Sequence, residues 1–316
     1  MMPKGLRSLR QRTVSWIMNQ GPSNRLASCV LQLACRAKGA KLSAQPAYLS
    51  LRNGDREMRL ARHHFAYCVD MAARFDIYYS VVEPHDEDGY KVVDYSTPRL
   101  QRYCQSGMEF ELASFPEEQD SIDDYFRWYT PSPGDIVFDV GAHCGVSSFE
   151  FSRRVGPSGR VFAMEPDPIN FALLQRNIQR HNLTNVTALQ IALSDSNGKA
   201  LFNSEGTIGS GLVFVFDRPT TGKSIEVETA TLEELCHRYG RPAFCKIDIE
   251  GAEIEVLRQA AGFLHQTPMH LVLDTHHFVR GQQTTAETEN LLRQAGYRVM
   301  SSAESGTTTT WAEQQK

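Results

Sequence analysis

The sequence contains no uninterrupted apolar run near the roughly 18 residues that a membrane-spanning helix needs. None of its seven cysteines forms a CxxC pair, and their irregular spacing argues against a disulfide framework or a structural zinc site. Its net charge of −4 gives no overall positive charge that would indicate nucleic-acid binding. The 316 residues therefore predict a globular protein of one large domain or two smaller ones, in a reducing, cytoplasmic compartment.

Acidic side chains are absent from the amino end until Asp55, whereas basic side chains are frequent there. An arginine-rich start without acids is typical of an organelle transit peptide, or of a basic helix in peripheral contact with an anionic surface. A helical extension with a solvated basic face is the simpler interpretation. Leu26, Val30 and Leu33 recur at helical spacing and would pack this extension onto the rest of the chain. We predict a mainly helical, basic extension over residues 1–89.

Turn-forming residues divide the remaining sequence into two parts. The polar segment PHDEDG ends the extension, and residues 90–133 predict short strands and a linking helix that Pro131 and Pro133 terminate. From residue 134 onward, apolar runs such as DIVFDV alternate with amphipathic helical segments. This alternation predicts an α/β domain over residues 134–316, with a mostly parallel sheet, helices on both faces and a C-terminal antiparallel hairpin.

The first strand of this domain ends in DVGAHCG, where Asp139 closes the strand and Gly141 and Gly145 bracket a turn into a helix. A dinucleotide-binding GxGxxG fingerprint would require glycine in the place of His143. This difference argues against an NAD- or FAD-dependent oxidoreductase. It is compatible with a ligand that lacks a pyrophosphate, such as S-adenosylmethionine.

Carboxylates also stand at the ends of two further predicted strands. Glu165 ends the strand in AMEPDP, where a carboxylate can accept both hydroxyls of an adenosine ribose. In KIDIEGAE, strand alternation sends Asp248 and Glu250 to the same side, where they suit a cationic group such as an amine or a sulfonium. Glu253 falls in the first turn of the next helix, where a negative charge is favoured by the helix dipole.

The segments DVGAHCG, AMEPDP, IALSD, TLEEL and KIDIEGAE occur in that order. In these segments the chain resembles the FkbM-type methyltransferases, a family that depends on S-adenosylmethionine, from about Tyr125 to its end. The resemblance implies a Rossmann-like class I methyltransferase fold with a seven-stranded sheet. It also implies methyl transfer to a hydroxyl of a sugar or small natural product. A non-catalytic module that binds the same nucleoside is the alternative function.

The resemblance further implies contacts to S-adenosylmethionine from the glycine loop, the ends of the second and third strands, and the KIDIEGAE strand. These residues are Asp139, Gly141, Ala142, His143, Gly145, Glu165, Ala192, Leu193 and Asp248. The first five would contact the methionine part, Glu165 the ribose, and Ala192 and Leu193 the adenine. Asp248 would lie near the methionine amine or the transferred methyl group.

The family tends to have a glutamate and a histidine after the fifth strand, whereas this chain has LDTHH. Asp274 and His276 are offset by two residues and can share a face. We predict His276 as the general base, oriented by Asp274, with His277 and His143 as second choices.

A divalent metal is an alternative means of activating the acceptor hydroxyl. Asp248, Glu250, Asp274 and His276 offer the mixed oxygen and nitrogen ligands that such an ion accepts.

Overall fold

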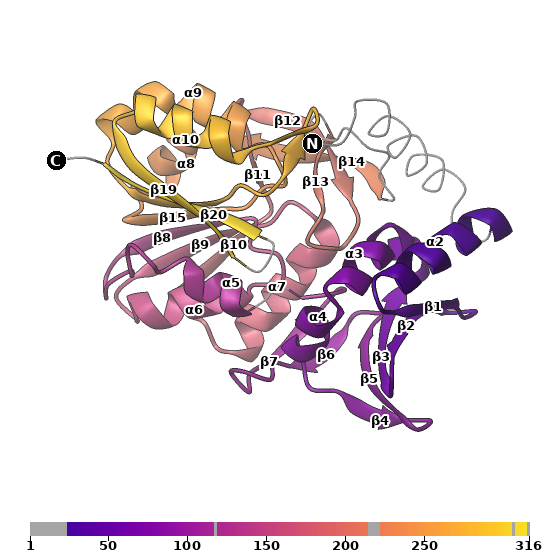
Figure 1. The fold of residues 1–316 in the computed structure, drawn as a ribbon. Helices are drawn as coiled ribbons and strands as arrows, with labels where there is room; N and C mark the ends of the chain where they lie inside the picture. Colours follow the sequence, from indigo (N-terminus) through magenta and orange to yellow (C-terminus); the bar gives the residue numbers. More distant parts are fainter. Residues whose placement is uncertain (1–23, 117–118, 214–221, 305–306, 315–316) are drawn as a thin grey trace. The chain divides into compact units, whose positions relative to one another are not determined.

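The computed structural model describes residues 24–116, 119–213, 222–304 and 307–314. The described residues form two compact units, one of residues 24–116 and one of the described residues from 119 onward (Figure 1). Most of the predicted basic amino end, residues 1–23, lies outside the described residues. Among the helices of the described ranges, none is long and apolar enough to cross a membrane.

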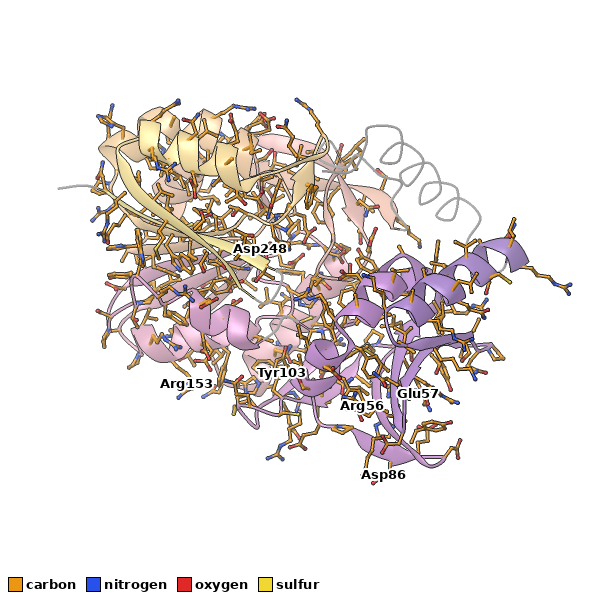
Figure 2. All side chains as sticks on the ribbon, viewed as in Figure 1. Arg56, Glu57, Asp86, Tyr103, Arg153 and Asp248 are labelled. Atoms are coloured by element: carbon orange, nitrogen blue, oxygen red, sulfur yellow. The ribbon has the colours of Figure 1, made fainter. Side chains whose placement is uncertain are left out.

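The first unit contains a five-stranded sheet of order β1-β2-β3-β5-β4 and a separate hairpin β6–β7. Its strands are β1 (Lys41–Ala44), β2 (Tyr48–Asn53), β3 (Arg56–Ala61), β4 (His85–Glu87), β5 (Tyr90–Tyr95), β6 (Arg99–Arg102) and β7 (Glu109–Leu112). Its helices are α2 (Arg25–Ala37), the 3-10 helix η1 (Arg62–Tyr67), α3 (Cys68–Ala73) and α4 (Phe75–Val81). Glu57, labelled in Figure 2, is buried in this sheet and accepts a hydrogen bond from Ser50.

The prediction of a mainly helical region up to residue 89 misses four strands, because β1 to β4 lie within its described part beside helices α2, η1, α3 and α4. Leu49 and Leu51 on β2 face Leu60 and Met58 on β3, so apolar pairing across strands determines the local structure. A division at residue 89 would also separate β4 from β5, which are neighbours in one sheet. The compact units instead divide after residue 118.

Helix α2 buries a different face from the one that the sequence indicated. Leu26 and Leu33 are 62% and 69% exposed, whereas Ala27, Leu31 and Cys35 are buried. These three residues follow one another at four-residue spacing, and the small side chains of Ala27 and Cys35 permit close packing of α2 on α3. The predicted packing through Leu26, Val30 and Leu33 is therefore wrong.

The second unit is built on a seven-stranded sheet of order β10-β9-β8-β15-β16-β20-β19. Its strands are β8 (Ile136–Val140), β9 (Arg160–Met164), β10 (Val186–Leu189), β15 (Phe244–Ile247), β16 (His270–Asp274), β19 (Tyr297–Glu304) and β20 (Thr307–Gln314). The first five strands in this order are parallel, and β20 lies antiparallel between β16 and β19. The predicted α/β fold, with its parallel sheet and C-terminal antiparallel hairpin, is confirmed.

Helices pack on both faces of this sheet, as the alternating pattern predicted (Figure 1). They are α5 (Gln119–Asp124), α6 (Val146–Val155), α7 (Pro168–Arg180), α8 (Leu232–Tyr239), α9 (Glu253–Gln266) and α10 (Thr285–Gln294). Helix α5 belongs to this unit: the Trp311 indole on β20 donates to the Asp124 carbonyl at 2.9 Å. The predicted boundary at residue 133 therefore separates α5 from the sheet against which it packs.

The predicted third strand, residues 185–193, is divided between two sheets. Only β10 joins the main sheet, whereas β11 (Ala192–Leu193) pairs with β14 in a four-stranded sheet of order β11-β14-β12-β13. The other strands of this smaller sheet are β12 (Gly198–Ser204), β13 (Gly211–Leu212) and β14 (Lys223–Ala230). A further hairpin joins β17 (Phe278–Val279) and β18 (Gln282–Gln283).

We predict that Gly141→Ala destabilises the second unit strongly, because an added Cβ would overlap the backbone carbonyl oxygen of Asp248. Gly134→Ala is the matched control, since Gly134 also has a positive φ but only a side-chain oxygen at 3.8 Å from the added Cβ. Positive φ alone costs about 1–2 kcal/mol for alanine. Chemical denaturation should show a loss at Gly141 that exceeds this cost by about 3 kcal/mol. Equal losses at the two glycines would contradict the close approach of the two backbones.

Candidate functional site

Asp139 at the end of β8 binds the strand to the start of α6. It is fully buried, and its Oδ2 accepts hydrogen bonds from Ser147 Oγ at 2.9 Å and Ser148 Oγ at 2.5 Å. Gly145, with φ 87°, forms the N-cap of this helix. Asp139 therefore fixes the glycine loop between strand and helix.

A buried lysine, which the sequence analysis did not select, lies between two of the predicted acids. Lys246 Nζ lies 3.7 Å from Asp139 Oδ1 and 3.7 Å from Asp248 Oδ2, and it donates to the Gly141 carbonyl at 2.8 Å. Its side chain is 1% exposed. The signal was present in KIDIEGAE, because a lysine within a buried parallel strand requires a charged or hydrogen-bonding partner.

Glu165 holds the other side of the glycine loop. Its Oε2 accepts from the His143 amide and its Oε1 from the Asp167 amide, both at 2.8 Å. Burial, reinforced by the negative charge of Asp167, raises the pKa of Glu165 to about 8. His143 adopts a positive φ of 49°, and burial lowers the pKa of its ring to about 4. The loop and the second strand end are thus one hydrogen-bonded arrangement.

Asp167 is a second residue that sequence reasoning missed. Its Oδ1 caps α7 by accepting from the Ile169 amide at 2.8 Å, and its Oδ2 accepts from Gly206 N and Ser210 Oγ. Asp167 follows the predicted ribose-binding glutamate by two positions and precedes Pro168, which is a typical N-cap pattern. It connects the start of α7 to the segment after β12.

The structure places Asp274 and His276 in different surroundings. Asp274 is buried, and its oxygens accept from Tyr125 OH at 3.0 Å and Thr309 Oγ1 at 3.2 Å. Burial and the charge of Asp248 raise the pKa of Asp274 to about 8. His276 is half-buried, and its ring lies beside that of His277, with ring centres 4.4 Å apart. The hydrogen bonds of Asp274 orient Tyr125 and Thr309, and no bond to His276 is found among the described residues.

His277, rather than His276, is the histidine that faces the acids of KIDIEGAE. Its Nε2 lies 3.6 Å from Asp248 Oδ1 and 3.4 Å from Glu250 Oε1, and its Nδ1 lies 3.2 Å from Glu253 Oε1 (Asp248 is labelled in Figure 2). Burial alone lowers the pKa of His277, but Glu250 and Glu253 raise it well above its ordinary value. Glu253 is therefore more than a helix-dipole residue, since it is fully buried against this ring.

The remaining predicted residues lie in the glycine loop and on β11 of the smaller sheet. Ala142 is fully buried in the glycine loop, and Ala192 and Leu193 are 5% and 1% exposed on β11. Glu165 directly follows β9, Asp139 lies on β8, and Asp248 directly follows β15. These three strands are adjacent in the sheet, in the order β9-β8-β15. The carboxyl ends of parallel strands meet at one edge, where α/β proteins bind ligands.

A model of the FkbM methyltransferase domain matches residues 139–299, which is just over half of the chain. The chain belongs to the FkbM methyltransferase family. The match begins at Asp139 and includes Glu165, Asp248 and His277. The FkbM assignment therefore covers the strand ends whose geometry is described above.

Two methyltransferases are similar to this chain over part of their length. Over 155 residues the chain is 30% identical to the 31-O-demethyl-FK506 methyltransferase FkbM of Streptomyces tacrolimicus, covering 40% of this chain and 59% of that protein. Over 144 residues it is 29% identical to the hexuronic acid methyltransferase AglP of Haloferax volcanii, covering 45% and 56%. The chain thus spans somewhat more than half the length of these relatives.

Among solved structures, a methyltransferase FkbM from Methylobacillus flagellatus aligns with a TM-score of 0.45 at 19% identity, covering 60% of this chain and 46% of that one. The Rossmann-like arrangement of the FkbM domain here follows from its own strand order and from the family match.

We predict that His143→Asn makes the free energy of unfolding less dependent on pH between about 4 and 6.5. The pKa of His143 is about 4 in the folded protein against an ordinary 6.5, so the unfolded chain binds a proton first as pH falls. The stability contributed by neutral His143 is complete above pH 6.5 and is lost as pH falls toward 4, by up to about 3 kcal/mol. Asparagine tolerates the positive φ and removes this titration.

Unfolding should be measured by denaturant titration between pH 4 and 7. His237→Asn, which changes an exposed histidine on α8, is the control and should retain the wild-type slope. Parallel curves for wild type and His143→Asn would contradict the lowered pKa.

Proposed function

We propose that this FkbM domain is an S-adenosylmethionine-dependent methyltransferase that methylates a hydroxyl on a sugar or small natural product. The observation that carries the proposal is the arrangement of Glu165, which bridges the glycine loop and the second strand end through two backbone amides. The names of the two relatives, a 31-O-demethyl-FK506 methyltransferase and a hexuronic acid methyltransferase, support an oxygen acceptor.

The residues at the strand ends fit the donor. Each oxygen of Glu165 accepts one backbone hydrogen bond and retains a lone pair, which suits the two hydroxyls of a ribose. The Asp248 side chain is 26% exposed and remains accessible to the methionine amine beside Lys246. Ala192 and Leu193 supply an apolar surface for adenine.

The glycine loop supports the donor mainly through its backbone. Asp139 is fully buried, and its side chain contacts Ser147, Ser148 and Lys246. We therefore assign it a positioning role, in which it fixes the loop of Gly141, Ala142, His143 and Gly145. This differs from the direct methionine contact that the resemblance implied.

When bound, S-adenosylmethionine supplies a sulfonium-activated methyl group. The chain's contribution is to hold the acceptor oxygen in line with that methyl group, which can contribute up to ~7–11 kcal/mol. His276 is the proposed base that takes the hydroxyl proton. His143 is an unsuitable base because burial lowers its pKa to about 4, and His277 because both of its ring nitrogens face carboxylates of the chain.

We predict that Glu165→Ala weakens S-adenosylmethionine binding at least tenfold, because it removes the acceptor for the ribose hydroxyls. Loss of about 1.4 kcal/mol corresponds to a factor of ten. Isothermal titration calorimetry measures the affinity, and circular dichroism confirms folding of the variant. Glu233→Ala, on the surface of α8, is the control and should bind as wild type does. Unchanged affinity in Glu165→Ala would reject the ribose assignment.

We predict that His276→Ala retains S-adenosylmethionine affinity within about twofold but lowers turnover about 100-fold, as expected for loss of a general base. The acceptor is first identified by mass spectrometry of glycan and metabolite extracts incubated with labelled donor. Turnover is then measured with that acceptor, using His265→Ala on α9 as a control. Wild-type turnover in His276→Ala would show that the base assignment is wrong. Donor binding without transfer to any acceptor would favour the binding module.

A further inference from the structure

Three side chains near the fourth and fifth strand ends converge on one point. Asp248 and Glu250 follow β15, and His277 follows β16. One ligand atom from each lies within 4.8 Å of the other two. These groups come from two segments of the chain, so sequence proximity alone does not bring them together.

The separations suit ligands of one small divalent ion. Protein ligands lie about 2.0–2.2 Å from zinc, which places neighbouring ligand atoms of a tetrahedral site about 3.4 Å apart. His277 Nε2 lies 3.4 Å from Glu250 Oε1 and 3.6 Å from Asp248 Oδ1. An ion between these atoms would require only small adjustments of the side chains.

His277 provides the second, independent observation. It is only 8% exposed, and within the described part of the chain its Nε2 has no partner aligned for a hydrogen bond, whereas its Nδ1 faces Glu253. A buried imidazole normally uses both nitrogens. The Nε2 atom instead points among carboxylate oxygens at 3.4 and 3.6 Å, as an imidazole does when that nitrogen binds a metal.

Glu253 holds the opposite nitrogen of the same ring. Its Oε1 lies 3.2 Å from His277 Nδ1 and is fixed by the amides of Ile249 and Gly251. A carboxylate that accepts from one nitrogen of a histidine orients the other nitrogen and makes it a better ligand. Glu253 therefore gives His277 the arrangement of a metal-binding histidine.

The backbone at Glu250 also supports a functional arrangement. Glu250 has a φ of 58° and is followed by Gly251 at 107°, so a non-glycine residue stands in the left-handed region. Such strain is characteristic of functional sites. This turn brings Glu250 and Glu253 to the same imidazole.

We propose that Asp248, Glu250 and His277 bind one divalent transition-metal ion, of the Mn²⁺ or Zn²⁺ type, with further coordination positions open. One nitrogen and two carboxylate ligands match this class better than magnesium or calcium, which prefer oxygen alone. The set differs from the one predicted from the sequence, because His277 replaces His276. Asp274 is excluded since its oxygens bind Tyr125 and Thr309.

The role of this ion rests on the proposed function. In an open position it would bind the acceptor hydroxyl and lower its pKa. The hydroxyl oxygen then forms the bond to the methyl carbon, the carbon–sulfur bond breaks with its electron pair going to sulfur, and the proton passes to His276. The neutral thioether leaves.

The test is Mn²⁺ titration of the full chain after EDTA treatment and dialysis, without S-adenosylmethionine, followed by electron paramagnetic resonance and calorimetry. We expect one saturable site in wild type. His277→Ala and Glu250→Gln should each weaken binding at least tenfold. Glu255→Gln, which changes a half-buried acid of α9 that pairs with Arg258, should bind Mn²⁺ as wild type does. If His277→Ala does not fold, the Mn²⁺ affinity of Glu250→Gln alone tests the site.

Two results would overturn the proposal: no saturable Mn²⁺ or Zn²⁺ binding by wild type, or affinity unchanged in both site variants. In either case His277 serves only as a cation for its three carboxylates. S-adenosylmethionine binding measured in EDTA tests the proposed function separately. Metal binding with no donor binding would leave this site standing and reject the methyltransferase activity.

Discussion

The approach of two backbones at the centre of the sheet determines the geometry of the whole site. Gly141 leaves no room for a Cβ against the carbonyl of Asp248, and the Asp248 amide donates to Val140 at 3.0 Å. Lys246 then donates to the Gly141 carbonyl, so the ends of β8 and β15 are joined through backbone and side chain. The positions of Asp139 and Asp248 follow from this junction, because both carboxylates neighbour the same ammonium group.

The second unit of the fold could be predicted because its strands are buried on both faces. The runs around residues 135–140 and 243–249 are mostly apolar, and a parallel sheet with helices on both faces is the structure that buries such runs. The first unit could not be predicted in the same way. Its strands pair Leu51 with Met58 across a short turn, and each shows a two-residue period only over a run of six residues. So short a run is weak evidence for a strand beside the neighbouring helical segments. Pairing partners, rather than local pattern, determine such a sheet.

The site was predicted as a set of strand-end acids, and those acids do lie on adjacent strands. The pattern could not show what lies between them. Alternation is reliable only within a strand, and β15 ends at Ile247, one residue before Asp248. Beyond it the positive φ of Glu250 redirects the chain, so Glu250 and Glu253 both reach His277. Likewise β16 ends at Asp274, and the offset-by-two argument for His276 assumes a strand that has already stopped.

The carboxylate of Asp167 joins two segments of the chain. Its Oδ1 caps the start of α7, and its Oδ2 accepts hydrogen bonds from Gly206 and Ser210. The length of the connection between β12 and β13 is therefore constrained by Asp167, which lies outside that connection. An insertion there is tolerated only if it returns the Gly206 amide to the same carboxylate; otherwise Asp167 Oδ2 loses a partner that holds this carboxylate at the start of α7.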